Sequence, residues 1–267
     1  MAGAGWVMRL HGIEAGAGPT VAILHGLFGS ARNFATIQRR LAAHYRVLAL
    51  DLRNHGESPR AAGMDYATLA EDVRETLAAR DALPAAVIGH SMGGKVAMRL
   101  ALAAPAAVSR LAVCDIAPVP YPSHGHGATV AAMQALPLSP ALTRAGAEAA
   151  LAAAVPSAPL RQFLLHSLRF GAAPSWRLGL AEIAQAMPAI ESWEAPAAAT
   201  YAGPTLFLTG GRSEYVRADD RPLIRAVFPH ARFVTLKKAG HWLHADDPEG
   251  FLAAISAFLA PLRAEGA

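Results

Sequence analysis

The chain is built from short, strongly apolar runs that alternate with segments of helical periodicity. The apolar runs span residues 21–24, 46–50, 86–88, 111–114, 205–208 and 232–236. The candidate helices span residues 33–43, 66–80, 91–104, 218–227 and 248–259. This alternation is typical of βα units, whose strands lie parallel in one sheet between layers of helices. The sequence therefore predicts an α/β fold with a mostly parallel central sheet, and residues 6–13 are expected to add an antiparallel edge strand.

Residues 117–200 interrupt this alternation with repeated prolines and alanine-rich helical pieces. The segment also carries many large apolar side chains, including Trp176 and Trp193, and is too apolar for a disordered linker. We interpret it as a helical cap inserted into a core of residues 1–116 and 201–267. Core and cap together are expected to form one compact unit.

Composition excludes several classes of protein. The hydrophobic fraction of 53% can fill a sizeable core, and the charged fraction of 16% disfavours extended disorder. The net charge is +4, but the basic residues are dispersed, which disfavours a nucleic-acid partner. The apolar stretches are too short or too interrupted to span a bilayer. The single cysteine, Cys114, and the absence of a signal-peptide pattern lead us to expect a cytoplasmic location. The oligomeric state that we expect is a monomer or a small homo-oligomer.

Residues 89–93 read Gly-His-Ser-Met-Gly and lie between an apolar strand and a helical segment. A serine on so sharp a strand-to-helix turn is pushed out of the sheet, with its hydroxyl exposed to a substrate. The flanking Gly89 and Gly93 are required because a Cβ at either place would crowd the strand against the helix. This context makes Ser91 the candidate nucleophile.

Two further loops complete the pattern of an acyl-transfer site. Residues 25–30 (HGLFGS) follow a buried strand, and the backbone N–H groups of Leu27 and Met92 are the natural oxyanion hole. The alternative is an ordinary glycine-rich turn, in which Ser30 or Asn33 caps the next helix, and the neighbouring Ser91 motif favours the oxyanion hole. After the last strand, His241 follows a glycine that frees the backbone to aim its ring. We therefore favour His241 over His244 as the general base.

The acid that would orient the histidine has two candidates. Asp115 directly follows the apolar run 111–114, whereas Glu214 lies in a glycine-loosened loop after the run 205–208. Either loop could reach the histidine across adjacent strand ends. A short, firmly placed carboxylate holds the imidazole tautomer better, which favours Asp115 and leaves Glu214 as the alternative.

Five ordered motifs, HGLFGS, DLRNHGES, GHSMGGK, CDIAP and AGHWLH, together resemble those of the α/β-hydrolase superfamily. Within it the chain resembles the YbfF-type bacterial esterases and the related mitochondrial abhydrolase proteins. The resemblance covers nearly the whole chain and implies the α/β-hydrolase fold, with helices flanking the sheet and an inserted helical cap. In that group the acid comes from the DIAP motif. This implies Asp115 as the acid and Ser213 as an auxiliary residue near the histidine.

These observations predict a serine hydrolase that cleaves carboxylic esters or thioesters of small to medium acyl chains, including acyl-CoA. Ser91 would attack the acyl carbon, with His241 as base and Asp115 orienting it, and no metal or organic cofactor is implied. The alternatives are another serine-triad activity (C–C bond hydrolysis, acyl transfer or cofactor-free peroxidation) and a receptor-like ligand-binding protein. The residues expected to line the substrate pocket are aromatic: Phe28, Phe163, Trp176 and Trp242.

Overall fold

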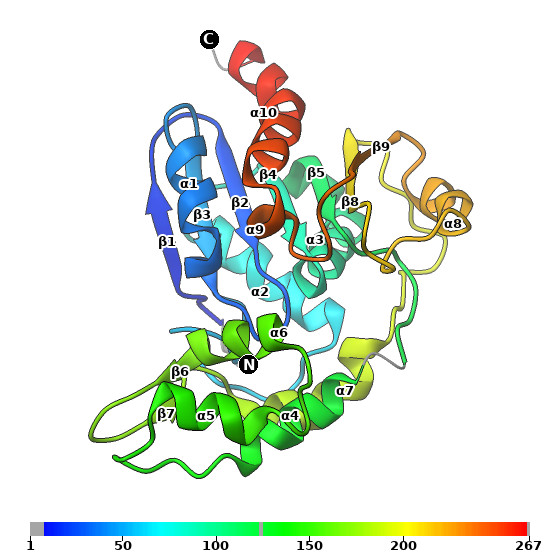
Figure 1. Cartoon of the computed structure of the whole chain (residues 1–267). Helices are drawn as coiled ribbons and strands as arrows, with labels where there is room; N and C mark the ends of the chain where they lie inside the picture. The colour runs from blue at the N-terminus through cyan, green and yellow to red at the C-terminus, as the bar shows by residue number, and fades with distance from the viewer. Residues whose placement is uncertain (1–7, 123–124, 266–267) are drawn as a thin grey trace, which may run out of the picture.

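The computed structural model describes residues 8–122 and 125–265, and within these ranges seven strands form the main sheet (Figure 1). Their order across the sheet is β1-β3-β2-β4-β5-β8-β9. Strand β1 pairs antiparallel with β3, and the other neighbours are parallel. The strand bounds are β1 Gly12–Ala15, β2 Thr20–Leu24, β3 Arg46–Leu50, β4 Ala85–His90, β5 Val108–Cys114, β8 Thr205–Gly210 and β9 Ala231–Leu236.

The strand order reverses between β2 and β4. From β2 the chain passes outward to β3, and it then returns to place β4 on the other side of β2. In open α/β sheets, ligands bind outside the carboxyl ends of the strands at such a reversal point. The loops that leave β2 and β4 begin with His25 and Ser91, so the topology places both candidate loops at this position.

Side chains of the central strands alternate between two hydrophobic cores. In β4, Ala86 and Ile88 pack into the core that contains Ile37 of α1 and Phe251 of α10. Val87 packs into the opposite core, which contains residues of α2 and α3. Because successive side chains of a strand point to opposite faces, a strand covered on both faces is apolar throughout.

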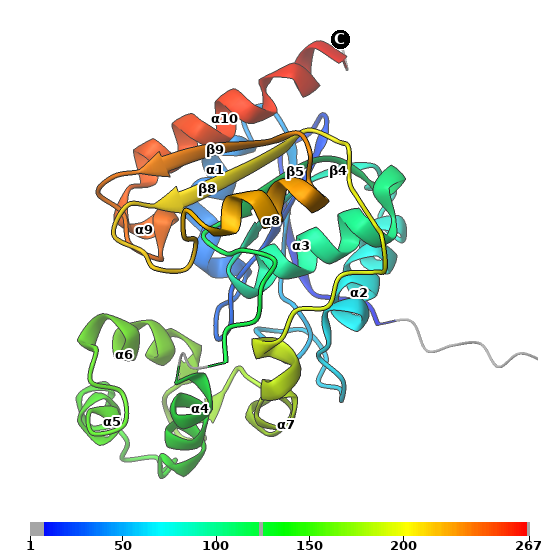
Figure 2. The same ribbon diagram turned by 90° about the vertical axis from the view of Figure 1, so that its right-hand side faces the viewer.

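Helices cover both faces of the sheet, with α1 and α10 on one side and α2, α3 and α8 on the other (Figures 1 and 2). The α-helix bounds are α1 Ala35–Leu41, α2 Tyr66–Ala78, α3 Met92–Ala103, α4 His126–Ala135, α5 Arg144–Leu151, α6 Ala158–Leu164, α7 Leu180–Glu191, α8 Asp220–Val227, α9 Leu243–Asp246 and α10 Pro248–Glu265. Short 3₁₀ helices are η1 Ala31–Phe34, η2 Pro105–Ala107 and η3 Leu165–Ser167.

The segment between β5 and β8 forms a layer of its own. It contains helices α4 to α7 and a small hairpin of β6 (Leu168–Arg169) and β7 (Ser175–Trp176), drawn in green to yellow-green below the core in Figures 1 and 2. Hydrogen bonds tie this cap to the core. The Ser167 hydroxyl donates to the Phe28 carbonyl at 2.9 Å, and the Gly179 N–H donates to the Asn54 carbonyl at 2.8 Å.

The predicted fold class is confirmed, and one element differs from expectation. We expected the edge strand at residues 6–13, of which 6 and 7 lie outside the described ranges. The strand that pairs with β3 is instead Gly12–Ala15. Gly12 lies opposite Leu50, the last residue of β3, so residues before Gly12 have no β3 residue to pair with. Within residues 8–122 and 125–265, none of the helices has the length and hydrophobicity that a bilayer crossing requires.

Candidate active site

Ser91 occupies a strained turn between β4 and α3. Its backbone has φ 53° and ψ −122°, a conformation that residues with a Cβ rarely adopt and that is typical of functional sites. The turn requires small neighbours: a Cβ on Gly93 would lie 2.5 Å from the carbonyl oxygens of Leu24 and His25, and one on Gly89 would collide with the Gly93 carbonyl. The glycines therefore let the strand and the helix approach closely while the serine is held at the tip.

Asp115 is held by three donors directly after β5. Its Oδ2 accepts a hydrogen bond from His241 Nδ1 at 2.7 Å and another from the Ser213 hydroxyl. Its Oδ1 accepts from the Gly210 N–H at 2.9 Å. The residue is 1% exposed, and its φ of 55° aims the side chain from the strand end towards β8. Since a carboxylate only accepts, His241 carries its proton on Nδ1, which leaves Nε2 free to act as a base.

Of the two candidate acids, the structure brings Asp115 to the histidine and leaves Glu214 exposed to solvent. Residues at and after the end of the neighbouring strand β8 hold the Asp115 carboxylate. Ser213, expected near the histidine, donates to Asp115. The serine and the Gly210 amide therefore fix the carboxylate that fixes the imidazole.

Two residues that the sequence analysis did not assign to the site hold His241 in place. The ring of Tyr215 stacks on the imidazole, with centroids 3.8 Å apart and planes inclined by 16°. His90 Nε2 donates to the His241 carbonyl at 2.8 Å, which fixes the backbone of the loop. Both lie next to residues that were singled out, Glu214 and Ser91, but nothing in their spacing identified them.

His244, the competing histidine, lies against the core. Its ring stacks on Phe34 with centroids 4.2 Å apart, and desolvation, followed by the nearby His241, lowers its pKa to about 4. His244 is therefore neutral at pH 7. The hydrogen bond to Asp115 is made by His241 and not by His244, which agrees with the choice of His241 as the candidate base.

Two buried histidines, His25 and His55, form hydrogen bonds in and next to the predicted oxyanion loop. Phe28 has φ 65°, and its N–H donates to His55 Nε2 at 3.2 Å. His25 Nε2 accepts the Leu52 N–H at 3.0 Å, and the His25 and His55 rings lie 5.0 Å apart. Burial lowers the pKa of His55 to about 3, so its Nε2 stays an acceptor at neutral pH. This network fixes the loop that carries Leu27.

The second predicted oxyanion donor is Met92, the first residue of α3. The amide groups in the first turn of a helix have no acceptor within the helix, and the helix dipole makes this end attractive to negative charge. Leu27 and Ser91 also line a common cavity. The arrangement can therefore stabilise an anion that develops on a carbonyl bound to Ser91.

A cavity of about 260 Å³ opens onto Ser91 and His241. Three of the aromatic residues predicted to line a pocket border it, Phe28, Phe163 and Trp242, and the rings of the last two lie 5.5 Å apart. The prediction for Trp176 is wrong. This side chain is 8% exposed inside the cap, because its indole N–H finds a partner there in the Met133 carbonyl at 3.1 Å.

The same cavity contains no evident metal site. Among the residues that the structure describes, no three His, Cys, Asp or Glu side chains gather closely enough to hold a metal ion.

Comparison with known proteins agrees with this fold. A family model described as the alpha/beta hydrolase fold matches residues 19–248, which include β2 to β9 and the whole candidate site. The chain belongs to the alpha/beta hydrolase fold family. This alpha/beta hydrolase is 41% identical over 250 residues to the sn-1-specific diacylglycerol lipase ABHD11 of Mus musculus. The aligned part covers 91% of this chain and 81% of the relative.

Two further relatives confirm the predicted resemblance. Esterase YbfF of Escherichia coli (strain K12) is 38% identical over 239 residues, or 90% of this alpha/beta hydrolase and 92% of the relative. The solved structure of a marine microorganism esterase is 36% identical and matches with a TM-score of 0.90, over 94% of this chain and 100% of that chain.

Proposed function

We propose that Ser91, His241 and Asp115 catalyse the hydrolysis of carboxylic esters with small to medium acyl chains, and of thioesters such as acyl-CoA. The relatives are an esterase and a diacylglycerol lipase by name, and this chain is likewise an ester-bond hydrolase. The observation that carries the proposed residue roles is the 2.7 Å hydrogen bond from His241 Nδ1 to Asp115 Oδ2, beside a cavity that Ser91 also lines.

The proposed reaction has two steps. His241 Nε2 takes the proton of the Ser91 hydroxyl as the oxygen attacks the acyl carbon, and it returns that proton to the leaving alcohol or thiol. A water molecule, activated by the same nitrogen, then hydrolyses the acyl-enzyme. Asp115 stabilises the imidazolium that forms in each step.

Negative charge develops on the carbonyl oxygen in both steps. The N–H groups of Leu27 and Met92 would stabilise it, and the loss of one such donor typically costs about 3–4 kcal/mol of transition-state stabilisation. The hydrogen bonds of His25 and His55 fix this loop before the substrate arrives. The N–H donors therefore need little reorganisation during the reaction.

The size and lining of the cavity support small to medium acyl chains. Its volume of about 260 Å³ lies below the roughly 300–1,000 Å³ of pockets that hold drug-sized ligands. Leu160, Phe163 and Trp242 give it an apolar wall, which suits a hydrocarbon chain.

The test is a kinetic series of p-nitrophenyl esters and acyl-CoAs of graded length, with Ser91→Ala as the variant. We expect kcat/KM to fall by at least about 10³-fold in Ser91→Ala for every substrate, with an unchanged melting temperature. The matched control is Ser139→Ala, an exposed serine of the cap, which should keep full activity. A Ser91→Ala variant with near wild-type rates would contradict the proposed mechanism.

We also propose a cytoplasmic location. Cys114 is a free, buried thiol and the single cysteine of the chain, which suits a reducing compartment. Fractionation of cells that express the chain with an epitope tag tests this, and recovery outside the cytoplasmic fraction would contradict it.

A further inference from the structure

Lys95 is a buried lysine that the proposed mechanism does not use. It lies on α3, four residues after Ser91, and both residues line one small cavity. The residue is 1% exposed. Burial of an ammonium group is unfavourable unless its charge and its donors are satisfied, so this position calls for an explanation.

Part of the environment of Lys95 is already satisfied. Its Nζ donates to the Ser192 carbonyl at 2.6 Å and lies over the rings of Tyr66 and Tyr121, 5.3 and 4.8 Å from their centroids. Desolvation lowers the pKa of this lysine to about 7, and the nearby carboxylate of Glu191 opposes that shift. The amine has three N–H groups when protonated and two when neutral, and among the described residues one acceptor oxygen, that of Ser192, hydrogen-bonds to it.

A second, smaller cavity connects this lysine with the candidate active site. It has a volume of about 30 Å³ and is lined by Lys95 and Glu191 together with Ser91 and the two predicted oxyanion donors, Leu27 and Met92. Such a volume holds one small polar group, since about 10–15 Å³ suffices for a water molecule. Ser91 borders both cavities, so a substrate bound at its hydroxyl can place one group in each.

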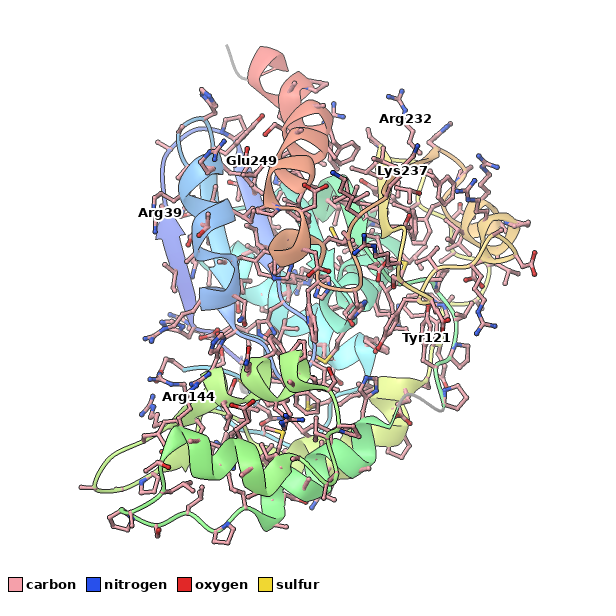
Figure 3. All side chains as sticks on the ribbon, viewed as in Figure 1. Arg39, Tyr121, Arg144, Arg232, Lys237 and Glu249 are labelled. Atoms are coloured by element: carbon pink, nitrogen blue, oxygen red, sulfur yellow. The ribbon has the colours of Figure 1, made fainter. Side chains whose placement is uncertain are left out.

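The wall of the small cavity is fixed at the junction of cap and core. Tyr121, labelled there in Figure 3, accepts the Ala117 N–H at 2.9 Å and donates to the Tyr215 carbonyl. The Tyr66 hydroxyl donates to the Ile190 carbonyl at 2.5 Å. Because both hydroxyls are engaged with the backbone, Lys95 is the side chain whose remaining N–H groups can serve a ligand.

The charges around the cavity decide which ligand fits. Glu191 balances the positive charge of Lys95, and it also lies 3.5 Å from His126 Nδ1. A carboxylate in this space would be repelled by Glu191 at close range, whereas an uncharged oxygen accepts a hydrogen bond from the ammonium without that cost.

We propose that this cavity is a subsite for an uncharged hydroxyl group of the substrate, and that Lys95 selects substrates by donating a hydrogen bond to it. The inference rests on the proposed ester hydrolysis at Ser91. The hydroxyl can belong to the alcohol half or to the acyl half of the ester. A methyl group in its place would leave a buried N–H without an acceptor, which is the strongest basis for rejecting a substrate of similar shape.

The test compares pairs of esters that differ by a methyl and a hydroxyl group. For the alcohol half the pair is propyl and 2-hydroxyethyl butanoate, and for the acyl half it is propyl butanoate and propyl 3-hydroxypropanoate. The measured quantity is the ratio of kcat/KM within each pair, which cancels changes common to both substrates. We expect Lys95→Met to lower the preference for the hydroxyl ester about tenfold to one-hundredfold in one pair.

The matched control is Lys238→Met, the same substitution at an exposed lysine, which should leave both ratios unchanged. Ratios in Lys95→Met that stay within about twofold of wild type for both pairs would overturn the inference. If the wild type hydrolyses none of these esters, the proposed function fails, which is a different result from hydrolysis without hydroxyl selection.

If Lys95→Met does not fold, as judged by its melting transition, a second variant tests the proposed subsite. Glu191→Gln removes the balancing charge from a side chain that is only partly buried. We expect it to raise the kcat/KM for carboxymethyl butanoate relative to propyl butanoate at least about tenfold at pH 6, a pH chosen because the loss of Glu191 also lowers the pKa of Lys95. An unchanged ratio would show that no cation in this cavity meets the substrate.

Discussion

The replacement of Asp115 by Asn tests how the histidine is oriented. The Asn carbonyl oxygen can keep the place of Oδ1, where it accepts the Gly210 N–H, so the amide NH₂ takes the place of Oδ2. In the wild type, Oδ2 accepts from His241 Nδ1 at 2.7 Å. An N–H donor at this position requires Nδ1 to be an acceptor, which moves the imidazole proton to Nε2. That nitrogen can then no longer take the proton of Ser91.

The expected loss follows from this change of tautomer. Where geometry is kept and the tautomer is wrong, kcat falls about 10⁴-fold. That factor corresponds to about 5.5 kcal/mol of transition-state stabilisation, at 1.36 kcal/mol for each factor of ten. The KM should change little, because Asp115 is buried beneath the imidazole and does not face the substrate.

The assay is the initial rate with the best p-nitrophenyl ester, together with the melting temperature of each variant. Glu214→Gln is the matched control, since Glu214 is exposed and follows the neighbouring strand. It should keep its activity within about twofold of wild type. The reasoning is refuted if Asp115→Asn stays within tenfold of wild type, or if Glu214→Gln loses as much activity.

Three further predictions follow from the contacts of the site. Tyr215→Ala removes the ring stacked on His241 and should lower kcat/KM about three- to tenfold, whereas Tyr215→Phe keeps the stack and the activity; equal losses in both variants would contradict this role. Phe163→Ala removes part of the apolar wall and so enlarges the cavity, which should increase the chain length with the highest kcat/KM; an unchanged optimum would contradict the role of Phe163 in that wall. Below pH 6.5 the unfolded state protonates His244, while in the folded protein burial lowers its pKa to about 4. His244 should therefore account for on the order of 3 kcal/mol of the fall in stability in urea from pH 6.5 to 4, and the fall should be smaller by that amount in His244→Gln, whereas identical pH profiles would contradict it.

The parts of the site that depend on local geometry could be predicted from the sequence. The glycines around Ser91 are required by contacts between a strand and the helix that follows it, only a few residues away. The same holds for the alternation of apolar runs, because each strand places its side chains in two cores with a period of two.

The choice between Asp115 and Glu214 needed the arrangement of the strands. Strands β5 and β8 are neighbours, so both acids follow adjacent strand ends. What separates them is the φ of 55° at Asp115, together with the Gly210 amide that receives its carboxylate. Residues alone supported Asp115 only by its length and position, and the family resemblance added to that support.

The assignments that failed or were missing depend on contacts between distant segments. An aromatic side chain in the cap can face the pocket or the interior of the cap, and for Trp176 the Met133 carbonyl decides between them. The stacking of Tyr215 on His241 and the burial of Lys95 beneath the cap likewise join parts of the chain that no local pattern connects.

The central claim is that Ser91 forms a covalent acyl-enzyme. The most direct measurement is mass spectrometry of the protein after reaction with a fluorophosphonate, which phosphonylates activated serines. We predict one adduct for each chain, located on the peptide that contains Ser91, and none at that position in Ser91→Ala. Labelling should also be strongly slowed in Asp115→Asn, because the base is misoriented. Ester hydrolysis by a protein that carries no adduct on Ser91, or an adduct on another residue that abolishes activity, would contradict the claim.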